Sequence, residues 1–371
     1  MSNLHVVLAG GGTAGHVNPL LATARALHDD GATVTAVGTT EGLENDLVPA
    51  AGVPLRTIER APFPRRPNLA AIQFPHRFHR AVKEAGAILD AERADVAVGF
   101  GGFASTPVYV AAKKRGIPVV IHEQNAKPGM ANKYGARFAA VVALTFASTP
   151  LAARDGATEL TGLPLRPEIA ALARARQQDP RAGRAEAAVR LGVDPDFVTL
   201  VVTGGSLGAQ HLNDVMTQSL PLFEGIQVVH LTGKGKDERV RAASAEVPHY
   251  RVFDYLQTME DAYAVADLVL CRAGAGTVAE LGALGIPAFF VPLPIGNGEQ
   301  ELNAADVVAA GGAYVVRDAD FTAPVMAARV IPLLADPAKR AAMSHAARGT
   351  SPIDGAARLA ALIEAAGTGR L

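Results

Sequence analysis

A glycine-rich turn that ends in a histidine is the first feature of this sequence that could do chemistry. The stretch GGGTAGH, residues 10–16, follows an apolar segment and opens a helical pattern. Backbone N–H groups at such a helix start stabilise negative charge, for example that of a pyrophosphate. The positive end of the helix disfavours imidazolium, so His16 should be neutral. A neutral imidazole can act as general base for a sugar hydroxyl; the alternative is a histidine with structural hydrogen bonds only.

The same turn also matches the pattern of a dinucleotide-binding fold. Gly10, Gly12 and Gly15 satisfy G-x-G-x-x-G. That function requires an acidic residue at the end of the second strand to bind the ribose. The corresponding segment, AVGTT at 36–40, contains no Asp or Glu, and Glu41 lies just beyond it. The pattern therefore argues against a nicotinamide oxidoreductase without excluding one.

Two further glycine turns occur in the second half of the chain. GGSLGAQ at 204–210 offers Ser206 to a phosphate, or alternatively as the N-cap of the next helix. CRAGAGTVAEL at 271–281 allows close approach of the backbone, and Thr277 can donate to an oxygen. Glu280 could accept both hydroxyls of a ribose, or could form a capping box with Thr277.

Three more loops carry polar or glycine-rich patterns. PLPIGNGEQELNA at 292–304 contains Gln300, which suits sugar hydroxyls or, alternatively, solvent. HEQNAKPG at 122–129 contains Asn125, which could reach an acetamido group or a hydroxyl. GFGGFASTP at 99–107 could hold a second phosphate-bearing ligand or form a plain turn.

Residues 60–83 are basic and apolar and contain no acidic side chain. The basic residues are Arg60, Arg65, Arg66, Arg77, Arg80 and Lys83, and the interleaved apolar ones are Leu69, Ile72, Phe74 and Phe78. Such a segment suits the surface of an anionic bilayer. The alternative is a helix packed on the core with a solvated basic edge.

These motifs lie between short β-branched segments that alternate with helical patterns, which predicts βαβ units and parallel sheets. The strand-like segments are 4–9, 33–38, 54–58, 95–100, 118–123 and 140–146, and then, after a restart at 196, the beginning of 196–216 followed by 226–233, 250–255, 267–271, 287–292 and 313–318. The restart predicts two doubly wound domains that face each other across a cleft. In such sheets ligands bind outside the carboxyl ends of the strands, where the glycine turns lie.

Composition agrees with a two-domain globular protein. The chain has 371 residues, 49% hydrophobic and 19% charged, with a net charge of −1 that does not indicate a nucleic-acid partner. One cysteine excludes an intramolecular disulfide. Neither a signal peptide nor a spanning segment is evident, which favours a soluble cytoplasmic protein. The expected domains are 1–163, joined by a C-terminal helix at 352–371, and 164–351.

Seven motifs together resemble one family. GGGTAGH, GFGGFAS, HEQN, LPLRP, GGSLGA, CRAGAGTVAE and GNGEQELNA, in this order, resemble the MurG family of peripheral membrane N-acetylglucosaminyltransferases. The resemblance covers residues 4 to about 355. It implies the α/β GT-B fold with two Rossmann-like domains. It further implies inverting transfer of GlcNAc from UDP-GlcNAc to the C4 hydroxyl of MurNAc in undecaprenyl-pyrophosphoryl-MurNAc-pentapeptide (lipid I), giving lipid II without a metal or other cofactor.

The resemblance also implies roles for residues, with His16 as general base. The implied donor-binding residues are Thr13, Ala14, Gly15, Asn125, Arg166, Ser206, Leu256, Ala275, Gly276, Thr277, Val278, Glu280 and Gln300. Gly12, Gly101 and Gly102 would cradle the acceptor's pyrophosphate. Residues 60–83 would contact the cytoplasmic face of the cell membrane, and other cell-wall assembly enzymes are potential partners. Leu163, Leu207 and Glu299 depart from the family pattern, which leaves the roles of Leu207 and Glu299 open.

Two other functions compete with transfer. A UDP-sugar epimerase could share this two-domain fold, but it needs no lipid acceptor, and the basic, apolar segment argues against it. A nucleotide-binding module without catalytic activity would fit the glycines but would leave His16 without a role.

Overall fold

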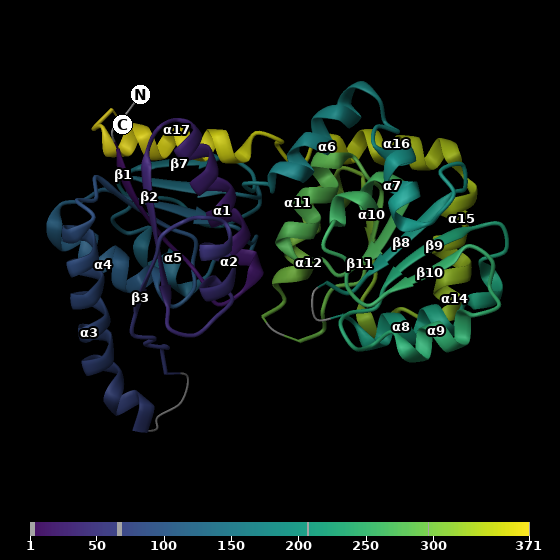
Figure 1. The fold of residues 1–371 in the computed structure, drawn as a ribbon, viewed down its shortest axis with the longest axis horizontal. Helices are drawn as coiled ribbons and strands as arrows, with labels where there is room; N and C mark the ends of the chain where they lie inside the picture. The colour runs from purple at the N-terminus through teal and green to yellow at the C-terminus, as the bar shows by residue number, and fades with distance from the viewer. Residues whose placement is uncertain (1–3, 65–68, 206–207, 296, 371) are drawn as a thin grey trace. The chain divides into compact units, whose positions relative to one another are not determined.

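The computed structural model describes residues 4–64, 69–205, 208–295 and 297–370. The chain forms two compact units, Met1–Arg166 with Asp354–Leu371 (unit 1) and Pro167–Ile353 (unit 2). Each unit is a parallel sheet with helices on both faces (Figure 1). The prediction of two doubly wound α/β domains is confirmed.

The sheet of unit 1 has the strand order β3-β2-β1-β4-β5-β6-β7. Its strands are β1 (His5–Ala9), β2 (Thr33–Thr39), β3 (Leu55–Ile58), β4 (Val96–Gly99), β5 (Val119–Glu123), β6 (Val141–Leu144) and β7 (Ala157–Leu160). All neighbours pair in parallel, with Val7 opposite Thr35 in β2 and Ala97 in β4. Six strands follow the predicted segments; β7 was not predicted because it is a short, mostly exposed edge strand.

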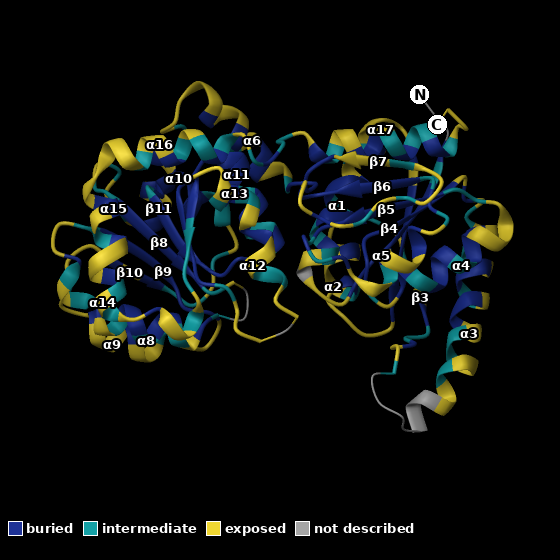
Figure 2. Ribbon diagram, turned by 180° about the vertical axis from the view of Figure 1, so that it is seen from behind, coloured by how far each residue is buried: buried dark blue, intermediate teal, exposed yellow. Residues whose placement is uncertain are grey.

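Helices cover both faces of this sheet. They are α1 (Ala14–Asp29), α2 (Glu44–Ala50), α3 (Leu69–Ala91), α4 (Ser105–Arg115), α5 (Met130–Gly135) and α17 (Gly355–Gly367). One core cluster joins the sheet to α3 and α4, and the other joins it to α1 and to the returning C-terminal helix α17. The inner strands are buried on both faces, while the outer sides of the helices are exposed (Figure 2), which explains why strands such as β1 and β4 are almost continuously apolar.

The sheet of unit 2 repeats this topology with the order β10-β9-β8-β11-β12-β13. Its strands are β8 (Thr199–Thr203), β9 (Gln227–Leu231), β10 (Tyr250–Phe253), β11 (Leu268–Cys271), β12 (Ala288–Phe290) and β13 (Ala313–Val315). In both units the first strand lies between the second and the fourth, which is the Rossmann order.

The helices of unit 2 include two in the predicted connection, α6 (Pro167–Gln178) and α7 (Arg184–Leu191). The others are α8 (Gln210–Gln218), α9 (Glu238–Ser244), α10 (Met259–Val265), α11 (Ala275–Leu284), α12 (Glu299–Asn303), α13 (Ala305–Ala309), α14 (Ala323–Val325), α15 (Ile331–Ala335) and α16 (Pro337–Arg348), with short 3₁₀ or π turns η1 (Leu220–Leu222), η2 (Asp318–Asp320) and η3 (Met326–Val330). Over the described residues, none of these helices or those of unit 1 has both the length and the apolar character needed to cross a bilayer.

Candidate active site

The glycine motifs flank the topological switch point of each sheet. In unit 1, GGGTAGH follows β1 and GFGGFAS follows β4, and these two strands are neighbours. In unit 2, GGSLGA follows β8 and CRAGAG follows β11, which are also neighbours. Chain connections leave the two neighbouring strands in opposite directions, and the carboxyl ends of the strands at such a point are where α/β folds bind ligands.

His16 is the third residue of α1, and its Nδ1 atom is held by the turn that precedes the helix. Nδ1 lies 3.1 Å from the carbonyl oxygen of Gly11 and 3.1 Å from Oγ1 of Thr13. A carbonyl oxygen only accepts hydrogen bonds, so Nδ1 carries the proton and Nε2 keeps its lone pair. A Cβ atom built on Gly101 would lie 3.0 Å from Nε2, so the basic nitrogen faces the loop after β4.

The ring of His16 is neutral near pH 7. Burial lowers the pKa of His16 below its usual value, while the hydrogen bond to Gly11 and the negative charge of Glu44 act in the opposite direction. The sequence predicts a neutral ring from the helix dipole, whereas burial is the largest cause in the structure.

A buried carboxylate that the sequence analysis did not single out lies beneath the same turn. Glu44, at the start of α2, is 1% exposed, and its Oε2 accepts the N–H of Gly12 at 2.7 Å. Cβ atoms built on Gly11, Gly38 or Gly42 would come within 2.6 Å of the Glu44 side chain. These glycines therefore make room for Glu44. The N–H of Gly12, which the resemblance assigns to the acceptor's pyrophosphate, is donated to a side chain of the protein.

Ser105 fastens the loop after β4 to the sheet. Its Oγ accepts the N–H of Gly101 at 3.1 Å and lies 2.7 Å from the Gly101 carbonyl oxygen and 3.0 Å from that of Ala9. Gly102 has a φ of +82°, and a Cβ atom there would lie 2.7 Å from the carbonyl oxygen of Gly11. Both the positive φ and the close approach require glycine. The two turns of unit 1 thus touch each other.

The HEQN loop joins the same cluster. Glu123 is buried and accepts the N–H of Asn125 at 3.0 Å and the side-chain amide of Asn132 at 3.0 Å. A Cβ atom on Gly15 would lie 3.4 Å from the Gln124 amide nitrogen, so this loop reaches the first turn. Three motifs that are far apart in the sequence therefore meet within unit 1.

In unit 2 the start of α11 is open. Gly274 is its N-cap, and no acceptor in the described part of the chain takes the N–H groups of Ala275, Gly276 or Thr277. Val278 instead donates its N–H to the Gly274 carbonyl oxygen at 3.0 Å, and its side chain is buried. Cβ atoms on Gly274 and Gly276 would meet no atom within 4 Å, and neither has a positive φ. The fold itself does not require glycine there, but a phosphate close to the helix start would.

Glu280 does not form the capping box that the sequence allows. Because Gly274 is the N-cap, Thr277 lies inside the helix, and that alternative is wrong. Glu280 accepts the hydroxyl of Tyr263, on α10, at 3.0 Å. The buried Tyr263 was not foreseen, since nothing in the sequence links it to α11.

The loop at 292–304 is attached to the turn that precedes α11. Oε1 of Gln300 accepts the N–H of Ala273 at 3.1 Å and that of Leu293 at 2.9 Å. A plain solvent loop is therefore the wrong interpretation for Gln300, which is only partly exposed. The side-chain oxygen of Gln300 therefore already accepts hydrogen bonds from the backbone of the protein.

The remaining predicted residues are placed less fully. Ser206 and Leu207 lie outside the described residues, and the N-cap of α8 is Ala209. Leu256 is partly exposed in the segment after β10, and Arg166 is partly exposed directly before α6. Their roles in donor binding stay predictions, as do those of Thr13 and Ala14.

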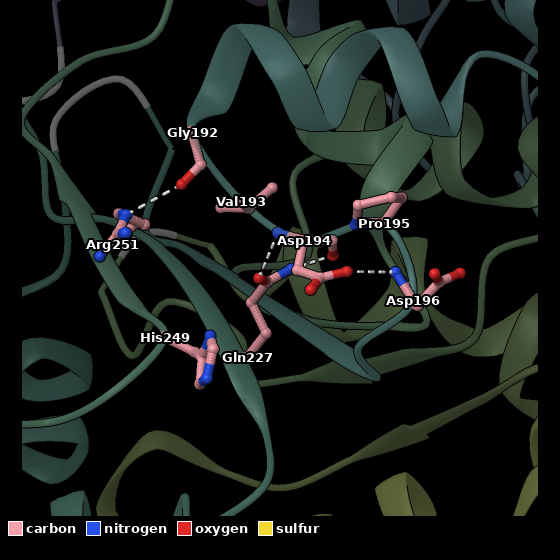
Figure 3. Close-up of a pocket in the computed structure, with 8 residues that line it drawn as sticks. All are labelled: Gly192, Val193, Asp194, Pro195, Asp196, Gln227, His249 and Arg251. Carbon is pink, nitrogen blue, oxygen red and sulfur yellow. Dashed lines mark hydrogen bonds between the residues drawn. The ribbon is translucent and has the colours of Figure 1, made fainter.

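A cavity elsewhere in unit 2 lies at the opposite end of its sheet. It has a volume of about 430 Å³ and is lined by Gly192, Val193, Asp194, Pro195, Asp196, Gln227, His249 and Arg251 (Figure 3). Gln227 bonds to both the N–H and the carbonyl oxygen of Asp194, and Arg251 donates to the carbonyl oxygen of Gly192. The cavity is at the amino ends of the strands, far along the sheet from the glycine turns, so we do not assign it to the active site.

Several arginines of the basic segment 60–83 pair with carboxylates outside it. Arg60 binds Glu41 at 2.8 Å, and Arg77 and Arg80 bind Glu59 at 3.0 and 2.5 Å. Burial raises the pKa of Glu59, but hydrogen bonds from the two arginines outweigh it, so the net shift is downward. Arg65 and Arg66 lie outside the described residues.

The apolar side chains of the segment divide into two groups. Phe74 and Phe78 pack on the core beside α4, and Phe63 meets Phe74 edge-on. Phe63 and Ile72 are 60% and 77% exposed. The predicted core-packed helix is therefore present as α3, and exposed apolar side chains are present at Ile72 on α3 and at Phe63 before it.

Comparisons with known proteins agree with this geometry. The glycosyltransferase family 28 N-terminal domain matches residues 6–144 and the C-terminal domain matches residues 199–359. A Bifidobacterium adolescentis UDP-N-acetylglucosamine–N-acetylmuramyl-(pentapeptide) pyrophosphoryl-undecaprenol N-acetylglucosamine transferase is 52% identical over 360 residues, covering 91% of this chain and 92% of the relative. The structure of Acinetobacter baumannii MurG superposes with a TM-score of 0.79 at 28% identity, covering 97% of this chain and 99% of that one.

A UDP-GlcNAc 2-epimerase from Neisseria meningitidis has the same fold at 12% identity, with a TM-score of 0.65 and coverage of 97% of this chain and 99% of that chain. Fold and glycine sites thus define a GT-B glycosyltransferase, because the family models match both units. The chain belongs to glycosyltransferase family 28 and, within it, to the MurG family.

Proposed function

We propose that this chain transfers GlcNAc from UDP-GlcNAc to the C4 hydroxyl of MurNAc in lipid I, forming lipid II. The observation that carries the proposal is the hydrogen bond from Nδ1 of His16 to the Gly11 carbonyl oxygen, which leaves Nε2 as a base. The 52% identity to an enzyme named for this transfer supports the same conclusion.

The proposed reaction is a direct displacement. Nε2 of His16 removes the proton of the acceptor hydroxyl as its oxygen attacks C1 of GlcNAc. The bond from C1 to the phosphate oxygen breaks, UDP leaves, and the anomeric centre inverts. The N–H groups of Ala275, Gly276 and Thr277 at the start of α11, together with Arg166 and Ser206, stabilise the charge that develops on UDP.

The same proposal assigns contacts to the sugar and ribose. Glu280, whose carboxylate accepts the hydroxyl of Tyr263, is the acceptor for the ribose hydroxyls. Asn125 and Gln300 contact the donor's GlcNAc and its hydroxyls. Gly101 and Gly102 approach the acceptor's pyrophosphate from the loop after β4.

We also propose that unit 1 binds the cytoplasmic face of the membrane through residues 60–83. Because Arg60, Arg77 and Arg80 are paired with carboxylates, insertion of Phe63 and Ile72 contributes more than their charge. Flotation with vesicles containing anionic lipid tests this. A double change Phe63→Ser and Ile72→Ser should abolish binding, whereas moderate salt should weaken it only slightly; strong binding by the double variant would contradict the proposal.

The assay that tests the activity measures UDP release. The protein is incubated with UDP-GlcNAc alone and with UDP-GlcNAc plus a lipid I analogue. Release that depends on the acceptor supports transfer. Conversion of the donor in the absence of acceptor would instead indicate an epimerase. The Neisseria meningitidis epimerase has the same fold as this chain at 12% identity.

A further inference from the structure

Glu44 is a buried carboxylate held by backbone N–H groups. Oε2 accepts the N–H of Gly12 at 2.7 Å, and Oε1 accepts the N–H of Thr39, at the end of β2, at 3.1 Å. The Thr39 hydroxyl lies 3.0 Å from Oε1 as well. In the part of the chain that the structure describes, no lysine or arginine pairs with Glu44. A buried charge without a cation is costly unless hydrogen bonds stabilise it, so this position is unusual for a residue without a role.

Three glycines are needed to accommodate this side chain. A Cβ atom at Gly11 would lie 2.3 Å from Oε1, one at Gly42 2.3 Å from Oε2, and one at Gly38 2.6 Å from Cγ. These glycines come from the turn after β1, from β2 and from the loop before α2. The fold thus makes a specific recess for a carboxylate directly beneath the turn that precedes His16.

One peptide group connects this carboxylate to the histidine. The N–H of Gly12 donates to Glu44, and the carbonyl oxygen of Gly11, in the same peptide group, accepts from Nδ1 of His16 at 3.1 Å. A hydrogen bond from an N–H to an anion polarises the peptide and makes its carbonyl oxygen a stronger acceptor. The order of groups is therefore carboxylate, peptide, imidazole, with Nε2 at the free end.

We propose that Glu44 is a positioning residue that acts on His16 through the Gly11–Gly12 peptide group. Glu44 holds the peptide in the orientation that keeps the Nδ1–H tautomer, and its charge stabilises the imidazolium that forms when Nε2 takes the acceptor's proton. The proton on Nδ1 stays in place, and Glu44 remains ionised throughout. This proposal rests on the proposed function, because it assumes that His16 is the base.

The charges around His16 make the proposal testable by pH. Among the described residues, Glu44 is the charged group whose field acts on the ring, and it raises the pKa of His16 against the effect of burial. Removing the charge should therefore lower the pKa of His16 further and move the acid limb of kcat/KM to lower pH. A residue with a purely structural role would not shift that limb.

The main experiment compares Glu44→Gln with Asp46→Asn, which makes the same charge change at an exposed position on the same helix. Glu44→Gln should lower kcat roughly 10- to 100-fold, as expected for losing a hydrogen bond to a charged group. Its acid limb should move to lower pH, while UDP affinity and Asp46→Asn stay at wild-type values. A folded Glu44→Gln protein with wild-type kcat and an unshifted limb would overturn the proposal.

A second measurement uses the unaltered protein, in case Glu44→Gln does not fold. The ¹⁵N shifts of labelled histidines, with His16→Ala for assignment, report which ring nitrogen carries the proton. The proposal expects Nδ1–H for His16 near pH 7, and an Nε2–H tautomer would overturn it. This result is independent of turnover. A protein that releases no UDP with a lipid I analogue would contradict the proposed function. The tautomer of His16 would still test whether the Gly11–Gly12 peptide group positions the ring.

Discussion

Glycines near the first two strands of unit 1 and glycines at the start of α11 in unit 2 have different surroundings. In unit 1, Gly11, Gly38 and Gly42 close around the Glu44 side chain, and Gly101 lies against His16. In unit 2, Gly274 and Gly276 face open space at the start of α11. At these positions of unit 1, glycine makes room for the side chains of Glu44 and His16, whereas at the start of α11 it leaves space that the protein does not fill.

This contrast indicates a division of labour. On the proposed function, unit 1 holds the base, His16, whose tautomer is set by Gly11, and unit 2 offers backbone N–H groups that no described residue accepts. A base must be held in one orientation to accept a proton, while an anion site must be accessible to its ligand. Three predictions test the contrast, from the largest expected effect to the smallest, and a fourth compares the two units by pH.

Loss of the base in unit 1 should have the largest effect. His16→Ala should lower kcat roughly 10²- to 10⁴-fold, the usual range for a positioned general base. UDP affinity should be almost unchanged, because His16 is not among the proposed contacts to UDP. Steady-state UDP release and calorimetric titration with UDP separate the two quantities, and turnover near wild type would exclude His16 as the base.

A bulkier side chain at the start of α11 in unit 2 should instead weaken the binding of UDP. A Cβ atom at Gly276 would meet no atom within 4 Å outside its own stretch of helix, so Gly276→Val should retain stability. UDP affinity should fall about 10- to 100-fold through lost contacts to a charged phosphate. Gly349→Val, also in open space and in the same unit, is the control. Equal UDP affinity in both variants would show that the α11 start does not bind the donor.

Substitution of the glycines that pack against Glu44 in unit 1 should instead lower the stability of the protein. Gly38→Ala places a Cβ atom 2.6 Å from Cγ of Glu44 and should destabilise the protein by about 1–3 kcal/mol through overpacking. Gly276→Ala should cost nothing, since its neighbourhood is empty. Chemical denaturation of Gly38→Ala and Gly276→Ala measures this difference. Equal denaturation midpoints would show that the two glycines do not differ in how closely the protein packs around them.

The last prediction concerns two buried histidines, one in each unit, and each should change the stability by about 1.4 kcal/mol per pH unit between its folded and unfolded pKa values. Burial lowers the pKa of His122 to about 4 and that of His230 to about 3. The unfolded chain binds these protons near pH 6.5, so stability is complete above that pH and declines as the pH falls toward the folded values. Urea unfolding at pH 7 and 5 should show this decline. His230→Gln should reduce its slope, while exposed His79→Gln should not.

The order of the elements and the place of the motifs could be predicted from the sequence. Strand segments such as 4–9 and 267–271 are apolar and bounded by glycine, and helical patterns follow them. Because parallel strands joined by helices place every turn after a strand at one edge, the sequence also predicts that His16 and Gly101 lie at the same end of the sheet. Edge strand β7 was missed because it is mostly exposed and lacks this pattern.

Tertiary structure alone decided which distant side chains contact the motifs. Glu44 lies 32 residues from Gly12 and meets it only because β2 pairs beside β1 and delivers α2 beneath the turn. Tyr263 reaches Glu280 from another helix, and Glu59 neutralises Arg77 from outside the basic segment. Periodicity and turn propensity are local properties of the chain, and they are enough to predict the elements, their order and the place of the motifs. The sequence by itself therefore determined the fold class and the motif positions. Hydrogen bonds and ion pairs between distant residues depend on register and packing, and these arise only when the sheets assemble.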